Sequence, residues 1–308
     1  MKNSKNIELL SPSGDTDCLK AAVLYGADAV YLGSDIFGMR VSMRKRDRNF
    51  GGDKLKTATD YAHSHGVKVY LTCNTTPTNA EADLFPEFIA EAVGSGVDAA
   101  IVADFGILAM VKKYAPTLPV HMSTQVGVTN YAAAAALYDL GAARVVLARE
   151  LSIADIAEIR AKTPKGLELE SFVHGAMCVS YSGRCLLSAY MKGRHANRGE
   201  CFQPCRLSYN VTENADGYVL NADDNGSFIL NANDLNMSEH IPELINAGVT
   251  SLKIEGRAKT AYYTGAVTRG YRYALDNALN GTDIDTDYLR RELNGVSHRP
   301  YSTGFYYG

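Results

Sequence analysis

The residues best suited to chemistry in this chain are four cysteines: Cys178, Cys185, Cys201 and Cys205. Six, fifteen and three residues separate them, and they account for four of the six cysteines in the chain. Thiols gathered in a glycine-rich stretch are typical of a metal or cluster site. The alternatives are disulfides, or thiols that bind nothing, and a reducing compartment disfavours the disulfides.

The spacing of these cysteines leaves the bound group open between zinc and an iron–sulfur cluster. Structural zinc sites commonly use Cys-x₂₋₄-Cys pairs. Cys201 and Cys205 fit such a pair, but Cys178 and Cys185 are too widely spaced to form a second one. Iron–sulfur clusters also take four thiolates and tolerate more varied spacing. The H-E-x-x-H zinc helix and the G-x-S-x-G nucleophile elbow of hydrolases are absent from the sequence.

A second group of polar residues lies within or directly after the predicted strands. They are His121, Gln125, Arg149, Glu170, His174, Lys253, Glu255, Arg257 and Lys259. Polar side chains at such positions cost free energy unless they are paired or contact a ligand. In a purely structural interpretation they form salt bridges inside the fold, for instance Glu170 with Lys253. In the functional interpretation they converge on one face and bind substrate.

A basic loop, which contains Arg40 and Arg44, follows the second predicted strand. Its charges are typical of a solvated surface, but their predicted place beside the basic residues of the cysteine-rich stretch favours an anionic substrate. Basic side chains supply the sequence-independent part of nucleic-acid binding. Phe37, Phe50 and Tyr190 are candidates for stacking on bases.

Alternating strands and helices position these residues. Eight short apolar runs predict strands at Ile7–Ser11, Ala29–Gly33, Val67–Cys73, Ala99–Val102, Val120–Ser123, Arg144–Ala148, Leu167–Val173 and Ser251–Ile254. Amphipathic helices lie between them, and a glycine often marks the helix end before the next strand, as at 26–30 and 141–145. Eight such units predict a closed (β/α)₈ TIM-type barrel. An open doubly wound sheet is the alternative, but its G-x-G-x-x-G fingerprint is absent.

Nearly eighty residues separate the seventh and eighth predicted strands, and this insertion contains the four cysteines. Insertions after a barrel strand lie on the C-terminal face, where barrel active sites are built, so the cysteine-rich cap, residues 174–236, should cover the barrel mouth. Within the insertion we expect a hairpin, formed by 207–213 and 218–222, and a helix at Met237–Asn246. The barrel domain then spans 1–293, and the tail 294–308 is expected to lead into a C-terminal domain that this chain lacks.

Composition and charge limit the protein's class. The net charge of −3 argues against a generally polyanion-binding protein but not against local basic patches. The first residues lack the apolar run of a signal peptide, and no stretch approaches the length of a membrane span. These features predict a cytoplasmic protein without a membrane partner.

Several motifs resemble the signature of the collagenase-like peptidase family U-32. They are Glu170-x-Phe172-x-x-Gly175-Ala176-Met177-Cys178, Gly183-x-Cys185-x-Leu187-Ser188, RGECFQPCR at 198–206, Asn233-Asp234-Leu235 and SLKIEGR at 251–257. The segments His121-x-Ser-Thr-Gln125 and Ala148-Arg-Glu-Leu151 are similar to the family as well. The resemblance therefore spans nearly the whole chain.

The resemblance implies a 4Fe-4S cluster on Cys178, Cys185, Cys201 and Cys205, and an enzyme of hydroxylation. The sequence of segments 198–206 and 251–259 is most similar to the branch that converts the wobble uridine of tRNA to 5-hydroxyuridine without O₂, with prephenate as hydroxyl source. The expected partners are tRNA and a longer paralogous subunit. One alternative is the peptidase activity in the family's name, and another is a non-enzymatic RNA-binding module with zinc on the four cysteines.

Roles within such an enzyme follow from position at the strand ends. Arg40, Arg44, Arg257 and Lys259 are expected to hold phosphate or the carboxylates of prephenate. His121, Gln125, Arg149 and Lys253 are further candidates for substrate binding. Glu170, His174 and Glu255 are candidates for proton transfer.

Overall fold

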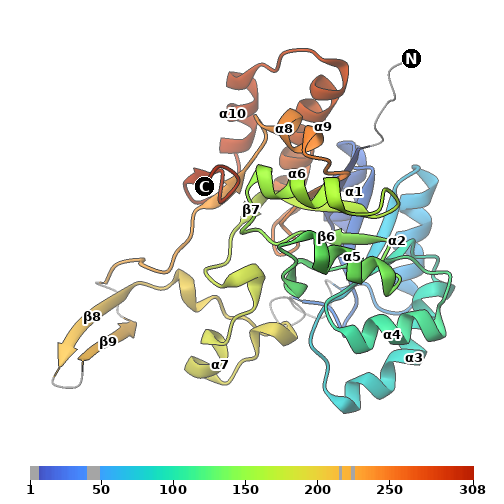
Figure 1. Ribbon diagram of the computed structural model, residues 1–308, viewed down its shortest axis with the longest axis horizontal. Coiled ribbons are helices and arrows are strands. Elements are labelled where there is room, and N and C mark those ends of the chain that lie inside the picture. The colour runs from blue at the N-terminus through green and yellow to red at the C-terminus, as the bar shows by residue number, and fades with distance from the viewer. Residues whose placement is uncertain (1–6, 40–48, 215–216, 223–225) are drawn as a thin grey trace.

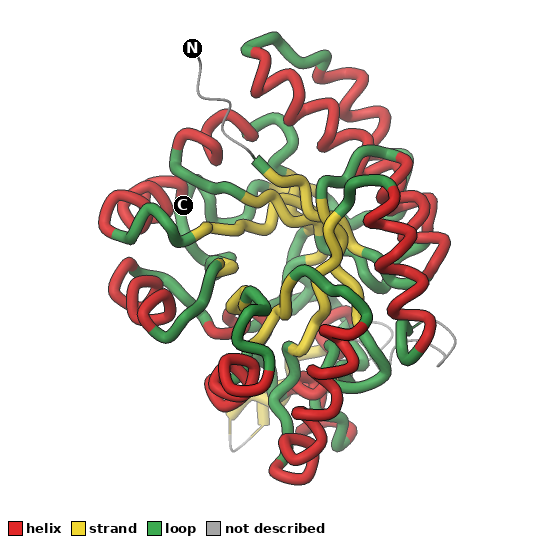
Figure 2. Tube along the Cα trace, turned by 90° about the vertical axis from the view of Figure 1, so that its right-hand side faces the viewer, coloured by secondary structure: helices red, strands yellow, loops and turns green. Residues whose placement is uncertain are grey.

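A computed structural model describes residues 7–39, 49–214, 217–222 and 226–308. Its centre is a closed barrel of eight parallel strands, surrounded by helices (Figures 1 and 2). The order is β11-β1-β2-β3-β4-β5-β6-β7, and a β11–β7 pairing closes the ring. The strands are β1 (Glu8–Pro12), β2 (Ala29–Gly33), β3 (Lys68–Cys73), β4 (Ala99–Val102), β5 (Val120–Met122), β6 (Arg144–Val146), β7 (Glu168–Ala176) and β11 (Ser251–Ile254). The predicted fold and all eight predicted strands are confirmed.

The helices surround this barrel with their apolar sides inward. They are α1 (Thr16–Leu24), α2 (Asp53–Ser64), α3 (Asn79–Gly94), α4 (Phe105–Tyr114), α5 (Tyr131–Asp139), α6 (Ile153–Lys162), α8 (Ile241–Asn246), α9 (Ala261–Asn280) and α10 (Thr286–Asn294). The exception is α10, which packs on α9. Capping boxes begin α3 at Thr78 and α6 at Ser152. The helix-ending glycines adopt the left-handed backbone that a side chain would disfavour, for example Gly26 at φ +90° and Gly141 at φ +95°.

The long insertion between β7 and β11 contains the lid, which we define as residues 178–206. The lid consists of short helical pieces joined by loops: η4 (Tyr181–Gly183), α7 (Leu187–Lys192), η5 (Ala196–Arg198) and η6 (Pro204–Arg206). The predicted hairpin follows as β8 (Tyr209–Asn214) and β9 (Gly217–Ala222), and it projects away from the barrel (Figure 1).

The structure adds two strands that the sequence did not suggest. β10 (Asp234–Asn236) pairs antiparallel with β7, and β12 (Tyr301–Ser302) in the tail pairs with β10. The helix predicted to begin at Met237 begins instead at Ile241. The reason is that the Met237 N–H donates to the carbonyl of Val173 on β7, which extends the strand-like pairing.

Candidate functional site

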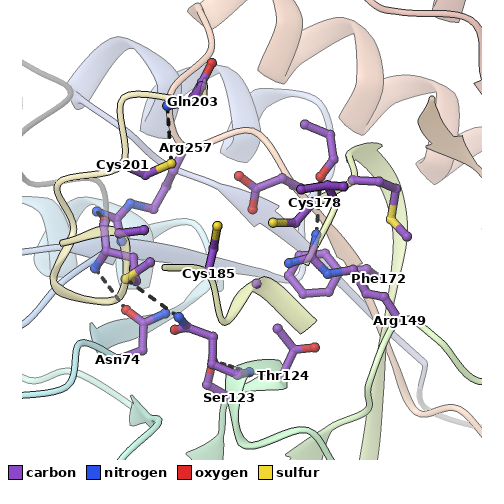
Figure 3. A pocket seen from close by; sticks show the side chains of 18 of the residues that line it. Asn74, Ser123, Thr124, Arg149, Phe172, Cys178, Cys185, Cys201, Gln203 and Arg257 are labelled. Carbon is purple, nitrogen blue, oxygen red and sulfur yellow. Dashed lines mark hydrogen bonds between the residues drawn. The ribbon is translucent and has the colours of Figure 1, made fainter. Parts of the chain in front are cut away.

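The four lid cysteines line one cavity at the C-terminal end of the barrel strands. Its volume is about 130 Å³, whereas a single water needs roughly 10–15 Å³ by the same measure, so a small organic molecule fits. All four thiols are free and half-buried. In Figure 3 the sulfurs of Cys178, Cys185 and Cys201 point toward a common space. The expectation that the cysteines cap the barrel mouth is met.

Two of the four sulfurs accept hydrogen bonds from the backbone. The Leu187 N–H donates to the Sγ atom of Cys185, and the Gln203 N–H donates to that of Cys201, both at 3.3 Å. Burial, followed by the nearby thiol of Cys178, raises the pKa of the Cys205 thiol. Within the described residues, no three His, Cys, Asp or Glu side chains are close enough to hold one metal ion.

One edge of the lid is fixed to the barrel through Asn197 and Arg198. The Cys185 N–H donates to Asn197 Oδ1 at 3.3 Å, and the Thr76 N–H donates to the Asn197 carbonyl at 3.0 Å. Arg198 donates to both oxygens of Glu81 at 2.8 Å. Glu81 also closes the capping box of α3, so Cys185 is tied to a helix of the barrel through this chain of contacts.

A second edge is fixed at the end of β6. The carboxylate of Glu150 accepts from the Ser182 N–H at 2.6 Å and from its hydroxyl at 2.7 Å. Ser182 has φ +44°, a left-handed conformation that costs free energy in a non-glycine residue. The two bonds to Glu150 therefore compensate for backbone strain next to Gly183, which lines the cavity.

The barrel side of the cavity contains polar atoms without partners. Arg149 lies with its guanidinium 4.8 Å from the ring centroid of Phe172 and donates to the Ala176 carbonyl at 3.3 Å. Among the residues that the structure describes, its buried Nε atom has no hydrogen-bond partner, and the same holds for Oε1 of Gln125. Buried polar atoms left unpaired in a cavity indicate a site for water or a polar ligand.

Lys253 lines the same cavity, but its ammonium group forms a buried ion pair with Glu170. It donates to Glu170 Oε1 at 2.7 Å, and Arg144 donates to Glu170 Oε2 at 2.9 Å. Burial alone would raise the pKa of Glu170, but Lys253 and Arg144 lower it to about 2. Glu170 does not line the cavity. The structural interpretation of the Glu170–Lys253 pair is confirmed, and the proton-transfer role of Glu170 stays a prediction.

His121 and His174 are also placed away from the cavity. His121 is buried beside Arg144 inside the barrel, and burial followed by that charge holds its pKa well below the usual value. His174 faces outward, with its ring 5.3 Å from that of Tyr271 on α9. Burial lowers its pKa to about 3. Lys253 pairs with Phe172 and the next residue, Ile254, pairs with His174, so Val173 is the extra residue of a β-bulge. This bulge turns the His174 side chain to the outside of the barrel.

The remaining candidates divide between the cavity and its surroundings. Glu255 and Arg257 line the cavity, and Arg257 donates to Thr72 Oγ1 at 2.6 Å. Lys259 does not line the cavity and donates to the Ser297 carbonyl at 2.9 Å. Arg40 and Arg44 lie outside the described residues. Of the three candidates for proton transfer, Glu255 alone borders the cavity.

The prediction that Phe37 and Phe50 stack on bases is wrong. Both are buried, and Phe37 packs edge-to-face on Phe85 of α3 at 5.2 Å between ring centroids. Tyr190 is exposed. The role of Asn197 was not predicted from the sequence, because it depends on contacts between segments far apart in the chain.

The family assignment follows from comparison with known proteins. The model described as peptidase family U32 matches residues 14–308. The chain belongs to this family. The solved structure of a U32 peptidase matches with a TM-score of 0.51 at 17% identity, over 83% of this chain and 96% of that one, which supports the barrel fold.

Relatives within the family differ in name. This chain is 42% identical over 97% of its length to the tRNA hydroxylation protein P of Helicobacter pylori, and covers 71% of that protein. It is 44% identical over 98% of its length to an uncharacterized protease of Methanocaldococcus jannaschii, and covers 73% of it. A 23S rRNA 5-hydroxycytidine synthase of Escherichia coli is 37% identical over 89% of this chain, which covers 40% of that protein.

Proposed function

We propose that this chain is an enzyme that hydroxylates a pyrimidine base in RNA, and that its target is the wobble uridine of tRNA. The names of two relatives, a tRNA hydroxylation protein and an rRNA hydroxycytidine synthase, support this class of reaction. The observation that carries the proposal is the shared cavity. Four free thiols of the lid face the same space as cationic and amide side chains of the barrel.

The donor set fits a 4Fe-4S cluster held by Cys178, Cys185, Cys201 and Cys205. All four candidate ligands are thiols that line one cavity, and two of them accept backbone N–H bonds. Iron–sulfur clusters take four thiolates, and hydrogen bonds to the sulfurs tune their reduction potential. Such a cluster would supply redox or Lewis-acid chemistry that amino-acid side chains lack.

The chain's own residues would bind and orient the substrates. Replacement of the C–H bond at C5 of uridine by a C–O bond oxidises the base by an electron pair, so the oxygen donor must accept that pair. We propose prephenate as this donor, with its carboxylates held by Arg149 and by Lys253. The amide oxygen of Gln125, which has no partner within the described part of the chain, suits the N–H of a uracil ring. Glu255 lines the cavity, and we propose that it transfers a proton in the reaction.

The peptidase alternative has less support in the cavity. Two of the hydroxyl side chains that line the cavity are those of Ser123 and Thr124. The Ser123 hydroxyl accepts from the Gln125 N–H, and the Thr124 hydroxyl donates to the Leu147 carbonyl. Neither hydroxyl bonds to a histidine in the part of the chain that the structure describes. A serine-type nucleophile requires such a base.

Mass spectrometry of tRNA nucleosides from a deletion strain tests the proposal. We expect 5-hydroxyuridine derivatives to disappear and to return with the wild-type gene, but not with a Cys185→Ser gene. Unchanged nucleosides in a strain without a redundant enzyme would reject the tRNA target. Protein purified without air should contain about four irons and four sulfides per chain. One zinc per chain would instead support the RNA-binding module, and peptide cleavage that survives cysteine replacement would support a peptidase.

A further inference from the structure

The outer face of the lid helix α7 is apolar and exposed. Ser188 points inward, where its hydroxyl is buried and accepts from the Phe202 N–H at 3.3 Å. Leu186 and Tyr190 are one helical turn apart, because the Tyr190 N–H donates to the Leu186 carbonyl at 3.0 Å. Residues at this spacing share a face. Tyr190 is 83% exposed and Leu186 is 60% exposed, so this face is open to solvent in the described structure.

The charge around this face opposes that of the rest of the chain. Residues 178–206 contain five Lys or Arg and one Glu, a net charge of +4, whereas the whole chain carries −3. One of these charges lies on α7 itself, since Lys192 Nζ is 5.0 Å from the ring centroid of Phe202. An aromatic side chain within a cationic surface is the combination that binds single-stranded nucleic acid.

We propose that Leu186 and Tyr190 form a stacking platform for an unpaired RNA base next to the one that enters the cavity, and that Lys192, on another face of α7, attracts the backbone of the same strand. The inference rests on the proposed function and names the surface that holds its substrate. The platform borders the cavity, because Cys185 lines the cavity and directly precedes Leu186. A stacked base contacts the Tyr190 ring, and Lys192, which shares a helical face with Ser188 rather than with Tyr190, attracts a phosphate of a neighbouring nucleotide.

Charge favours RNA over a protein partner on this face. Protein interfaces are depleted of Lys at their core, whereas phosphates attract it. Stacking also requires no particular base, since every base has an aromatic face. The platform therefore contributes affinity for an unpaired strand, and the choice of the target base is left to the cavity.

Binding of a fluorescein-labelled oligouridylate to the anaerobically purified full chain tests this inference by fluorescence anisotropy. Tyr190→Ala should weaken binding by about fivefold to a hundredfold, the range for loss of one stacked base. Tyr190→Phe should bind like the wild type, because the ring remains. Tyr114→Ala is the matched control, because Tyr114 is exposed beside Lys113 at the opposite end of the barrel. It should leave binding unchanged.

Salt dependence tests Lys192 separately. Lys192→Ala should reduce the slope of log K against log salt by about 0.7, the value for one phosphate on a single strand. The inference is overturned if Tyr190→Ala binds like the wild type, or if a fully paired duplex or a denatured collagen peptide displaces the oligouridylate from this face more effectively than unlabelled oligouridylate does.

The same assay separates the two proposals. Loss of oligouridylate binding in Tyr190→Ala, together with unchanged nucleosides in the deletion strain, would retain the platform and reject the hydroxylation. Normal binding in Tyr190→Ala, together with lost nucleosides in the deletion strain, would reject the platform and retain the hydroxylation.

Discussion

Replacement of Glu170 by Gln should destabilise the protein by about 3 kcal/mol. The carboxylate is completely buried and accepts from Lys253 and from Arg144. Gln keeps the size and removes the charge, so two buried cations lose a counterion. Breaking a buried ion pair costs about 3–5 kcal/mol. The pKa gives a similar figure, since the difference between 4.5 and about 2 corresponds to about 3 kcal/mol. In the variant Arg144 still pairs with Glu8, so we expect the lower end of the range of about 3–5 kcal/mol.

Urea unfolding at pH 7 measures this effect. Glu168→Gln is the matched control, because Glu168 pairs with the same Arg144 at 2.6 Å but is 49% exposed. An exposed pair contributes less than about 1 kcal/mol. The reasoning is refuted if Glu170→Gln and Glu168→Gln unfold with equal free energies.

The pH dependence of this difference has a defined sign. The folded-state pKa of Glu170 lies below its unfolded value, so its contribution to stability is present above pH 4.5 and is lost as pH falls toward 2. The gap between wild type and Glu170→Gln should therefore be constant from pH 7 to about pH 5 and narrow below that. A gap that widens on acidification would contradict the ion-pair interpretation.

Three further predictions concern the site, and a fourth concerns His174, which lies outside it. Cys185→Ser should lose iron and sulfide in metal analysis of anaerobic protein, whereas Cys73→Ser, a buried thiol away from the lid, should retain both; equal content would remove Cys185 from the ligand set. Asn197→Ala should release iron to a chelator about tenfold faster, the effect of outer partners on metal sites, and an unchanged rate would show that the lid does not depend on this contact. Glu255→Gln should keep the wild-type unfolding free energy and reduce hydroxylation by about 10²-fold or more, so activity near wild type would exclude proton transfer there. Burial lowers the pKa of His174 to about 3, so the folded protein loses stability as pH falls from 6.5 toward 3. Between pH 7 and pH 5 the free energy of unfolding of His174→Gln should therefore fall by about 2 kcal/mol less than that of the wild type. Equal decreases in the two proteins would contradict this.

The strands were predictable because a parallel barrel buries both faces of each strand. That requirement produces continuous apolar runs such as Ala29–Gly33, and helix-ending glycines mark where each run begins. The place of the four cysteines followed from topology alone, since a loop after β7 must lie at the C-terminal face.

The directions of individual side chains were not predictable in the same way. His174 faces outward because of the bulge at Val173, which depends on its pairing with β11 eighty residues later. Phe37 is buried because helix α3 covers it. Such contacts are set by tertiary packing between distant segments, and no local pattern of residues records them.

The lid's own structure explains why its anchors matter. Its longest helix, α7, has six residues, far fewer than the roughly 12–15 that a marginally stable isolated helix needs. Order in the lid must therefore come from contacts outside it: Asn197 to Thr76, Ser182 to Glu150, and the Arg299 guanidinium, which donates to the Met177 carbonyl at 3.4 Å. These contacts hold the segments that flank Cys178 and Cys185 against the rest of the chain. A group bound by all four thiols adds its binding free energy to the same folded lid. Cluster content and lid order should therefore change together when an anchor is removed.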